Sequence, residues 1–169
     1  MEALRGVDWK DNEDAASRAR RRRHLSKAGA MDHMAGYSVY NDGSVREYQF
    51  HAKQIAAGKN FDNTGAFGPL MVTKDEIADP QNLNLRTRLN GQQVRSSNTK
   101  HMIFKISQLI SYAPQIFELI PGDVIVTGTP SGVGFSRKPP LFMKVGDVVE
   151  VEIEKVGLLS NPVANEAAL

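Results

Sequence analysis

From about Met31 onward, short apolar runs alternate with turn residues, and this alternation predicts a domain built mostly of β-strands. One segment, Leu83–Leu89, alternates apolar and polar residues as a half-buried strand does. Asn90-Gly91 follows it directly and predicts a tight hairpin. The expected strands cover residues 37–40, 69–73, 83–89, 92–95, 124–127, 148–154 and 157–163, and the strand at 124–127 is expected to be buried.

Two short helices are expected between these strands. Ser44 and Glu47 have the spacing of a capping box and predict a helix through about residue 53. A second helix is expected over residues 102–112, after the capping residues 97–99, with one apolar face made by Ile103, Ile106, Leu109 and Ile110. Residues 58–68 are expected to form a loop. The predicted fold class is therefore α+β, mostly β, a β-roll or sandwich with two or three short helices, and not a doubly wound parallel sheet.

The first 30 residues differ from the rest of the chain. They hold few large apolar residues and contain an arginine run, Arg18–Arg23. The whole chain of 169 residues has 21 basic and 19 acidic residues, and eight of the basic and six of the acidic residues lie within residues 1–34. The net charge of +2 therefore belongs to this N-terminal part. We expect residues 1–30 to be a poorly ordered segment before a domain over residues 31–165.

Composition also excludes several classes of function. The chain has no cysteine, which excludes disulfides and thiolate chemistry. No apolar run approaches 18 residues, and the start lacks a secretory pattern, so we expect a cytoplasmic protein with no membrane association. The domain is electrically balanced and no aromatic residue interrupts the arginine run, so nucleic-acid binding is not expected.

Three loops carry residues that could do chemistry. Asp42 ends an apolar strand, where a carboxylate suits Mg²⁺, Mn²⁺ or Ca²⁺, although its local sequence favours a simple turn. Lys59 could place a positive charge over a substrate carboxylate or enolate, or it could be an ordinary solvated lysine. The glycine-rich loop 128–134 could offer backbone N–H groups and the hydroxyl of Thr129 to an anion, or could only connect two strands.

Taken together, the sequence resembles the C-terminal catalytic domain of the fumarylacetoacetate hydrolase family over about 130 residues. The resemblance rests on segments in a fixed order and spacing. They are residues 32–46 (DHMAGYSVYNDGSVR), 58–62 (GKNFD), 67–69 (FGP), 79–83 (DPQNL), 89–91 (LNG), 97–99 (SNT), 102–104 (MIF), 121–134 (PGDVIVTGTPSGVG) and 145–151 (VGDVVEV).

The resemblance implies a hydrolase, lyase or isomerase that acts on a 2-oxo or 1,3-dicarbonyl acid through a metal-stabilised enolate. It also implies a homodimer and a place in the catabolism of aromatic compounds. By position, Asp42 matches the metal-binding aspartate, Lys59 the catalytic lysine beside metal and substrate, and Gln49 and Thr129 two substrate-binding residues. Thr64 matches a threonine that supports a metal ligand, and the implied metal is Mg²⁺ or Mn²⁺, with Ca²⁺ as a further option.

One part of the family pattern is absent from the sequence. The family places a Glu-x-Glu pair of metal ligands on a strand before the Ala-Gly-Tyr segment, and a general-base histidine earlier. Where that strand belongs, this chain has the arginine run, and Glu13 is the only acidic candidate nearby. A site with one carboxylate should bind metal weakly, and loss of the strand should leave a free sheet edge. The alternative function is therefore a catalytically impaired remnant or an interaction module.

Overall fold

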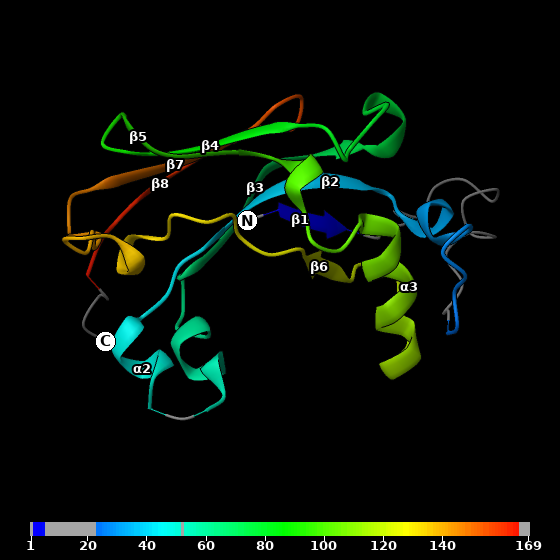
Figure 1. Ribbon diagram of the computed structural model, residues 1–169, viewed down its shortest axis with the longest axis horizontal. Coiled ribbons are helices and arrows are strands. Elements are labelled where there is room, and N and C mark those ends of the chain that lie inside the picture. Colours follow the sequence, from blue (N-terminus) through cyan, green and yellow to red (C-terminus); the bar gives the residue numbers. More distant parts are fainter. Residues whose placement is uncertain (1, 6–22, 52, 166–169) are drawn as a thin grey trace.

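The computed structural model describes residues 2–5, 23–51 and 53–165. Within these residues the chain forms two four-stranded sheets with short helices at their ends (Figure 1). The strands are β1 (Glu2–Arg5), β2 (Gly36–Asp42), β3 (Gly65–Thr73), β4 (Asn84–Leu89), β5 (Gln92–Asn98), β6 (Val124–Val126), β7 (Val148–Ile153) and β8 (Gly157–Pro162). The α-helices are α2 (Arg46–Gln49) and α3 (Ile106–Ile116). Short 3-10 turns are η1 (Ala30–His33), η2 (Ile55–Lys59), η3 (Lys74–Glu76), η4 (Thr99–His101) and η5 (Gly134–Ser136).

The strand order is β3-β2-β1-β6 in one sheet and β5-β4-β7-β8 in the other. Every described strand pair is antiparallel. Strands β2 and β3 contact β7 and β8, so the two sheets pack face to face. The predicted fold class, α+β and mostly β, is confirmed.

The core lies between the sheets, and the alternation in the sequence explains which side chains enter it. In β7, Val149, Val151 and Ile153 are buried while the residues between them are more exposed. The hairpin between β4 and β5 turns at Asn90 and Gly91, whose φ angles of 52° and 75° are those of the two-residue turn that this dipeptide favours.

Helix α3 starts and ends four residues later than predicted. Asn98 stays at the end of β5, where its side chain caps η4, and Gln108 caps the helix by accepting from the backbone N–H of Lys105. Ile106 and Ile110 are buried as predicted, whereas Ile103 precedes the helix and is 90% exposed. Helix α2 is also shorter than predicted. Its N-cap is Val45, and Ser44 makes no capping bond.

Two predictions about the strands were wrong. The segment at 124–127 was expected to be buried, but Val124 and Val126 are about 40% exposed because β6 is the edge of its sheet. A free edge was expected where the family strand is missing. Instead, β1 pairs with β2 on one side, Glu2 opposite Val39, and with β6 on the other. Of the arginine run, the structure describes Arg23 and leaves out residues 18–22; Glu13 and most of the 1–30 segment also lie outside the described residues.

Two of the segments that resemble the family, residues 79–83 and 97–99, are joined by side-chain hydrogen bonds beside the sheet β5-β4-β7-β8. This set of hydrogen bonds is called the clamp below. The hydroxyl of Thr99 donates to the carbonyl of Pro80 (2.7 Å) and accepts from the N–H of Leu83 (2.9 Å). The amide of Gln81 donates to the carbonyl of Thr99 and accepts from the N–H of Ile106. The clamp joins the loop before β4 to the end of β5 and the start of α3. The segments 79–83 and 97–99 are therefore structural.

Candidate active site

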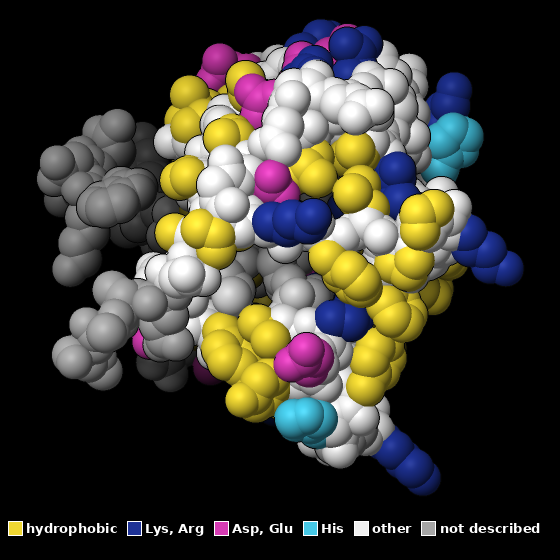
Figure 2. All heavy atoms as spheres, turned by 90° about the vertical axis from the view of Figure 1, so that its left-hand side faces the viewer, with side chains coloured by type: hydrophobic (Ala, Val, Ile, Leu, Met, Phe, Trp, Pro, Cys, Tyr) yellow, Lys and Arg dark blue, Asp and Glu magenta, His cyan; other side chains and the backbone are white. Residues whose placement is uncertain are grey.

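A pocket of about 1010 Å³ opens at one end of the two sheets. The end of β2, helix α2 and η2 form one side, strands β4, β5 and β7 form the other, and the segment 128–143 closes it. Figure 2 looks onto this end of the molecule, where hydrophobic, basic and acidic side chains surround a hollow. Asp42, Gln49, Lys59 and Thr129, which the sequence places far apart, all line this pocket.

Asp42 and Lys59 form an ion pair inside the pocket. The ammonium Nζ of Lys59 contacts Oδ2 of Asp42, and the two side chains are 25% and 14% exposed. The carboxylate therefore pairs with a side chain and does not close the turn that the local sequence favoured. Burial and the charge of Asp42 raise the pKa of the neighbouring Tyr40, so this phenol stays neutral.

Two glycines, Gly43 and Gly58, allow the backbone segments that carry Lys59 and Asp42 to lie close together. Gly43 donates its N–H to the carbonyl of Thr64 (3.0 Å), and a Cβ at Gly43 would lie only 2.4 Å from that oxygen. Gly58 is buried against Gln49 and Val45, where a Cβ would meet backbone atoms at 2.7 Å. Because neither position has room for a side chain, the loop that carries Lys59 can close onto the end of β2.

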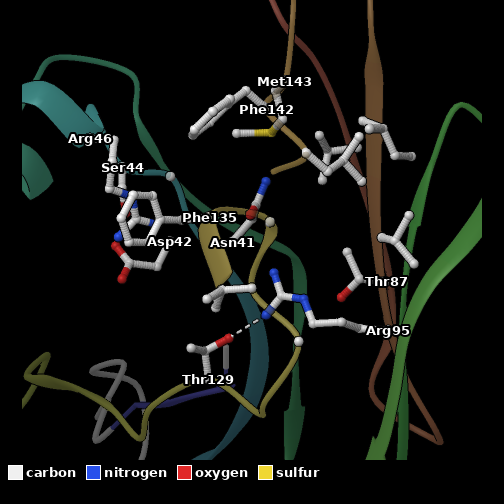
Figure 3. Close-up of a pocket in the computed structure, with 18 of the residues that line it drawn as sticks. Asn41, Asp42, Ser44, Arg46, Thr87, Arg95, Thr129, Phe135, Phe142 and Met143 are labelled. Atoms are coloured by element: carbon white, nitrogen blue, oxygen red, sulfur yellow. Dashed lines mark hydrogen bonds between the residues drawn. The ribbon is translucent and has the colours of Figure 1, made fainter. Parts of the chain in front are cut away.

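The other predicted residues have distinct surroundings. Gln49 is buried on α2 and accepts a hydrogen bond from the guanidinium of Arg46. Thr129 accepts from Nη1 of Arg95 at 2.7 Å, which leaves its own hydroxyl hydrogen free to donate into the pocket (Figure 3). Thr64 does not line the pocket; its hydroxyl donates to the carbonyl of Phe61 (2.6 Å), and its own backbone carbonyl accepts from the N–H of Gly43.

A family profile described as the fumarylacetoacetate (FAA) hydrolase C-terminal domain matches residues 15–164. The chain belongs to the fumarylacetoacetate hydrolase family. The resemblance stated from the sequence is thus confirmed over most of the chain.

Several relatives of this chain are named as enzymes. "Oxaloacetate tautomerase fahd2, mitochondrial" from Xenopus laevis is 48% identical over 159 residues, which are 93% of this chain and 50% of that protein. "Oxaloacetate tautomerase FAHD2A, mitochondrial" from Homo sapiens is 46% identical over 159 residues, with the same coverage of both proteins. The chain spans about half the length of the curated relatives it matches.

Solved structures of the family share the fold. A fumarylacetoacetate hydrolase from Exiguobacterium antarcticum has a TM-score of 0.87 and 34% identity, covering 98% of this chain and 55% of that one. A 5-carboxymethyl-2-hydroxymuconate delta-isomerase from Mycobacterium smegmatis has a TM-score of 0.81 and 32% identity, covering 99% of this chain and 58% of that one.

Several pocket residues of this family member were not predicted from its sequence. Arg46 lies next to Gln49, with its guanidinium carbon 5.1 Å from the centre of the Phe135 ring, and Arg95 and Arg137 come from separate segments. The position of Arg46, four residues after Asp42, was a signal that could have found it. No local signal marks the other two arginines, because only the tertiary structure brings β5 and the segment 128–143 together.

Basic residues outnumber acidic ones around the pocket. Among the described lining residues, the basic ones are Arg46, Lys59, Arg88, Arg95 and Arg137, and the acidic ones are Asp42 and Glu47. Burial, with a smaller effect from the charge of Arg137, lowers the pKa of Arg95 below its usual value. The pocket therefore suits a small anionic ligand.

The described residues do not fit a complete divalent-metal site. No group of three or more His, Asp or Glu side chains capable of holding a metal occurs within the part of the chain that the structure describes. Asp42 is the predicted ligand, and one of its oxygens is already in contact with the ammonium of Lys59. Mg²⁺ and Mn²⁺ bind through several oxygen ligands, so Asp42 alone does not supply their coordination.

Proposed function

We propose that this chain acts on a small 2-oxo or 1,3-dicarbonyl acid and promotes formation of its enol or enolate, as a hydrolase, lyase or isomerase. The observation that carries the proposal is the Lys59–Asp42 ion pair inside a pocket whose charged lining residues are mostly basic. The names of the relatives make oxaloacetate, a 2-oxo diacid, the first substrate to test.

The chemistry of the pocket residues supports this reaction class. When the carbon next to a carbonyl group gives up a proton to solvent water, or an acyl group to an attacking water molecule, the electron pair of the broken bond forms the enolate and negative charge develops on the carbonyl oxygen. An ammonium beside that oxygen lowers the barrier. Lys59 has this role in the proposal, and Asp42 holds its ammonium in place. Thr129 donates its hydroxyl to a substrate oxygen, while Arg46 and Gln49 orient the substrate carboxylate.

A bound Mg²⁺ or Mn²⁺, expected from the resemblance, would supply a Lewis acid. The described residues do not complete its coordination, and the roles proposed above belong to the side chains of the chain itself. The metal requirement is measured directly by running the same assay with Mn²⁺ and with a chelator.

The test is a tautomerisation and cleavage assay on oxaloacetate and on an acylpyruvate, followed by loss of enol absorbance. Lys59→Met should lower the rate about 100- to 1000-fold, because one donor to the developing oxyanion is lost. Lys100→Met removes the same charge from an exposed lysine outside the pocket and should leave the rate unchanged. A wild-type chain inactive on both substrates, with and without Mn²⁺, would overturn the proposal.

The alternative of an impaired remnant has one observation in its favour, namely the incomplete metal-ligand set among the described residues. It predicts that oxo acids bind without turnover, which the same assay reveals when combined with calorimetry.

A homodimer is also part of the proposal, and light scattering in solution tests it. No described helix has the length and apolar character needed to cross a bilayer. The two relatives described above are named as mitochondrial proteins, so the cytoplasmic location stays a prediction, which cell fractionation can check.

A further inference from the structure

Two arginines meet on the side of the pocket opposite the Asp42 and Arg46 side chains. Arg95 extends from β5 toward Thr129, while Asp42 and Arg46 lie across the pocket (Figure 3). Arg137 follows η5, and its guanidinium donates to the carbonyls of Val94 and Gly132. Both arginines are half-buried, and both line the pocket.

Arg95 and Arg137, like Arg46, differ in their partners from the two pocket cations that have a counter-ion. Lys59 pairs with Asp42, and Arg88 pairs with Glu152 at 2.6 Å. Within the part of the chain that the structure describes, Arg95 and Arg137 bind only neutral oxygens and form no ion pair with a carboxylate. Two like charges without a counter-ion repel each other, and an anion between them would remove that repulsion.

The local backbone holds the arginines in this arrangement. Gly132 has a φ of +88°, and a Cβ there would lie 3.3 Å from Cγ of Arg95. The glycine thus lets the 128–134 loop pack along the stem of Arg95, while Arg137 ties the far side of that loop to β5. The arrangement depends on packing between separate segments, which distinguishes it from two solvated arginines that happen to be neighbours.

We propose that Arg95 and Arg137 form a second anion-binding position, which holds the distal carboxylate of a dicarboxylic oxo acid. The inference rests on the proposed function, in which the reacting end of the substrate lies at Lys59. A diacid would then have one charged group on each side of the pocket, and a monoacid would leave the arginine pair without an anion. Arg95 also donates to the hydroxyl of Thr129. The position for the distal carboxylate is therefore hydrogen-bonded to a residue that contacts the reacting end of the substrate in the proposed function.

The test compares two ligands that differ only at the distal end, L-malate and 2-hydroxybutyrate. Both have a hydroxyl group where the substrate has a ketone and therefore cannot enolise, so titration calorimetry measures binding without turnover. Wild type should bind malate more tightly. Arg95→Gln should weaken malate binding about 10- to 100-fold, the effect of losing a hydrogen bond to a charged group. It should weaken 2-hydroxybutyrate binding by a clearly smaller factor, because that ligand loses only the effect of the contact between Arg95 and Thr129.

Two further variants complete the design. Arg95→Lys keeps the charge and should retain the preference for malate, and Arg86→Gln removes an exposed arginine of β4 outside the pocket and should change neither affinity. Equal weakening of both ligands by Arg95→Gln, no weakening of either, or no malate preference in wild type would each overturn the inference. The turnover assay decides the proposed function separately, because it does not depend on discrimination between these two ligands.

Discussion

Replacement of Thr99 by valine tests whether the segments 79–83 and 97–99, which lie beside the second sheet, are structural. Thr99 is 1% exposed, and its hydroxyl both donates to Pro80 and accepts from the N–H of Leu83. Valine has nearly the same shape but leaves that buried N–H and carbonyl without partners. Each lost hydrogen bond costs about 1 kcal/mol, and an unsatisfied buried group about 1–3 kcal/mol, so we expect Thr99→Val to cost about 2–4 kcal/mol.

The assay is thermal and urea unfolding followed by circular dichroism. For a chain of this length the loss corresponds to a fall in Tm of about 5–15 °C. The urea m-value should stay the same, because the folded and unfolded states keep their surface areas. Thr99 does not line the pocket, so enzyme activity well below the Tm should not change.

Thr87→Val is the matched control for this prediction. Thr87 is also buried, on β4, but its hydroxyl makes no hydrogen bond among the described residues. The same substitution there should change stability by less than about 1 kcal/mol. If Thr99→Val and Thr87→Val had equal effects, the clamp would not be the source of stability and the reasoning would be refuted.

Three further predictions concern the site and one turn. Isothermal titration of the chain with Mn²⁺ should show only weak binding, with a Kd of about 0.1 mM or above. Asp42→Asn should abolish this binding. A micromolar Kd would instead show that the chain supplies further metal ligands. Gly43→Ala should destabilise the chain by about 1–3 kcal/mol, because its Cβ would overlap the carbonyl of Thr64, and a melting curve like that of wild type would contradict this. The pKa of Asp147 lies below its ordinary value of 3.8 because the side chain of Asn90 and a backbone N–H donate to its carboxylate. Because the carboxyl pKa of Asp147 is lower in the folded than in the unfolded chain, the ionised side chain stabilises the protein at pH values above the unfolded-state pKa. This stabilisation is lost as the pH falls through the folded-state pKa. Asp147→Asn should therefore lower the Tm at pH 7 and have no such effect in strong acid.

The local pattern of the sequence was enough for the strands that are half-buried. The alternation in β7 fixes which residues enter the core, and Asn90-Gly91 fixes the turn between β4 and β5, because both depend on neighbours along the chain. Helix limits were harder. The residues at 97–99 can cap a helix in isolation, but in the folded chain Asn98 caps η4 and Thr99 bonds to Pro80 and Leu83, so α3 begins later.

The sequence by itself determined the family, the mostly-β fold and the identities of Asp42, Gln49, Lys59 and Thr129 as candidates, because these follow from ordered motifs and local periodicity. It left open whether Asp42 is a turn residue and whether Lys59 is a solvated lysine. The tertiary structure decided both questions by placing their side chains in contact, which required Gly43 and Gly58 to let two loops approach. It also brought Arg95 and Arg137 together from distant segments. The repulsion between two charged groups depends on their distance in space, and that distance cannot be read from their separation along the chain.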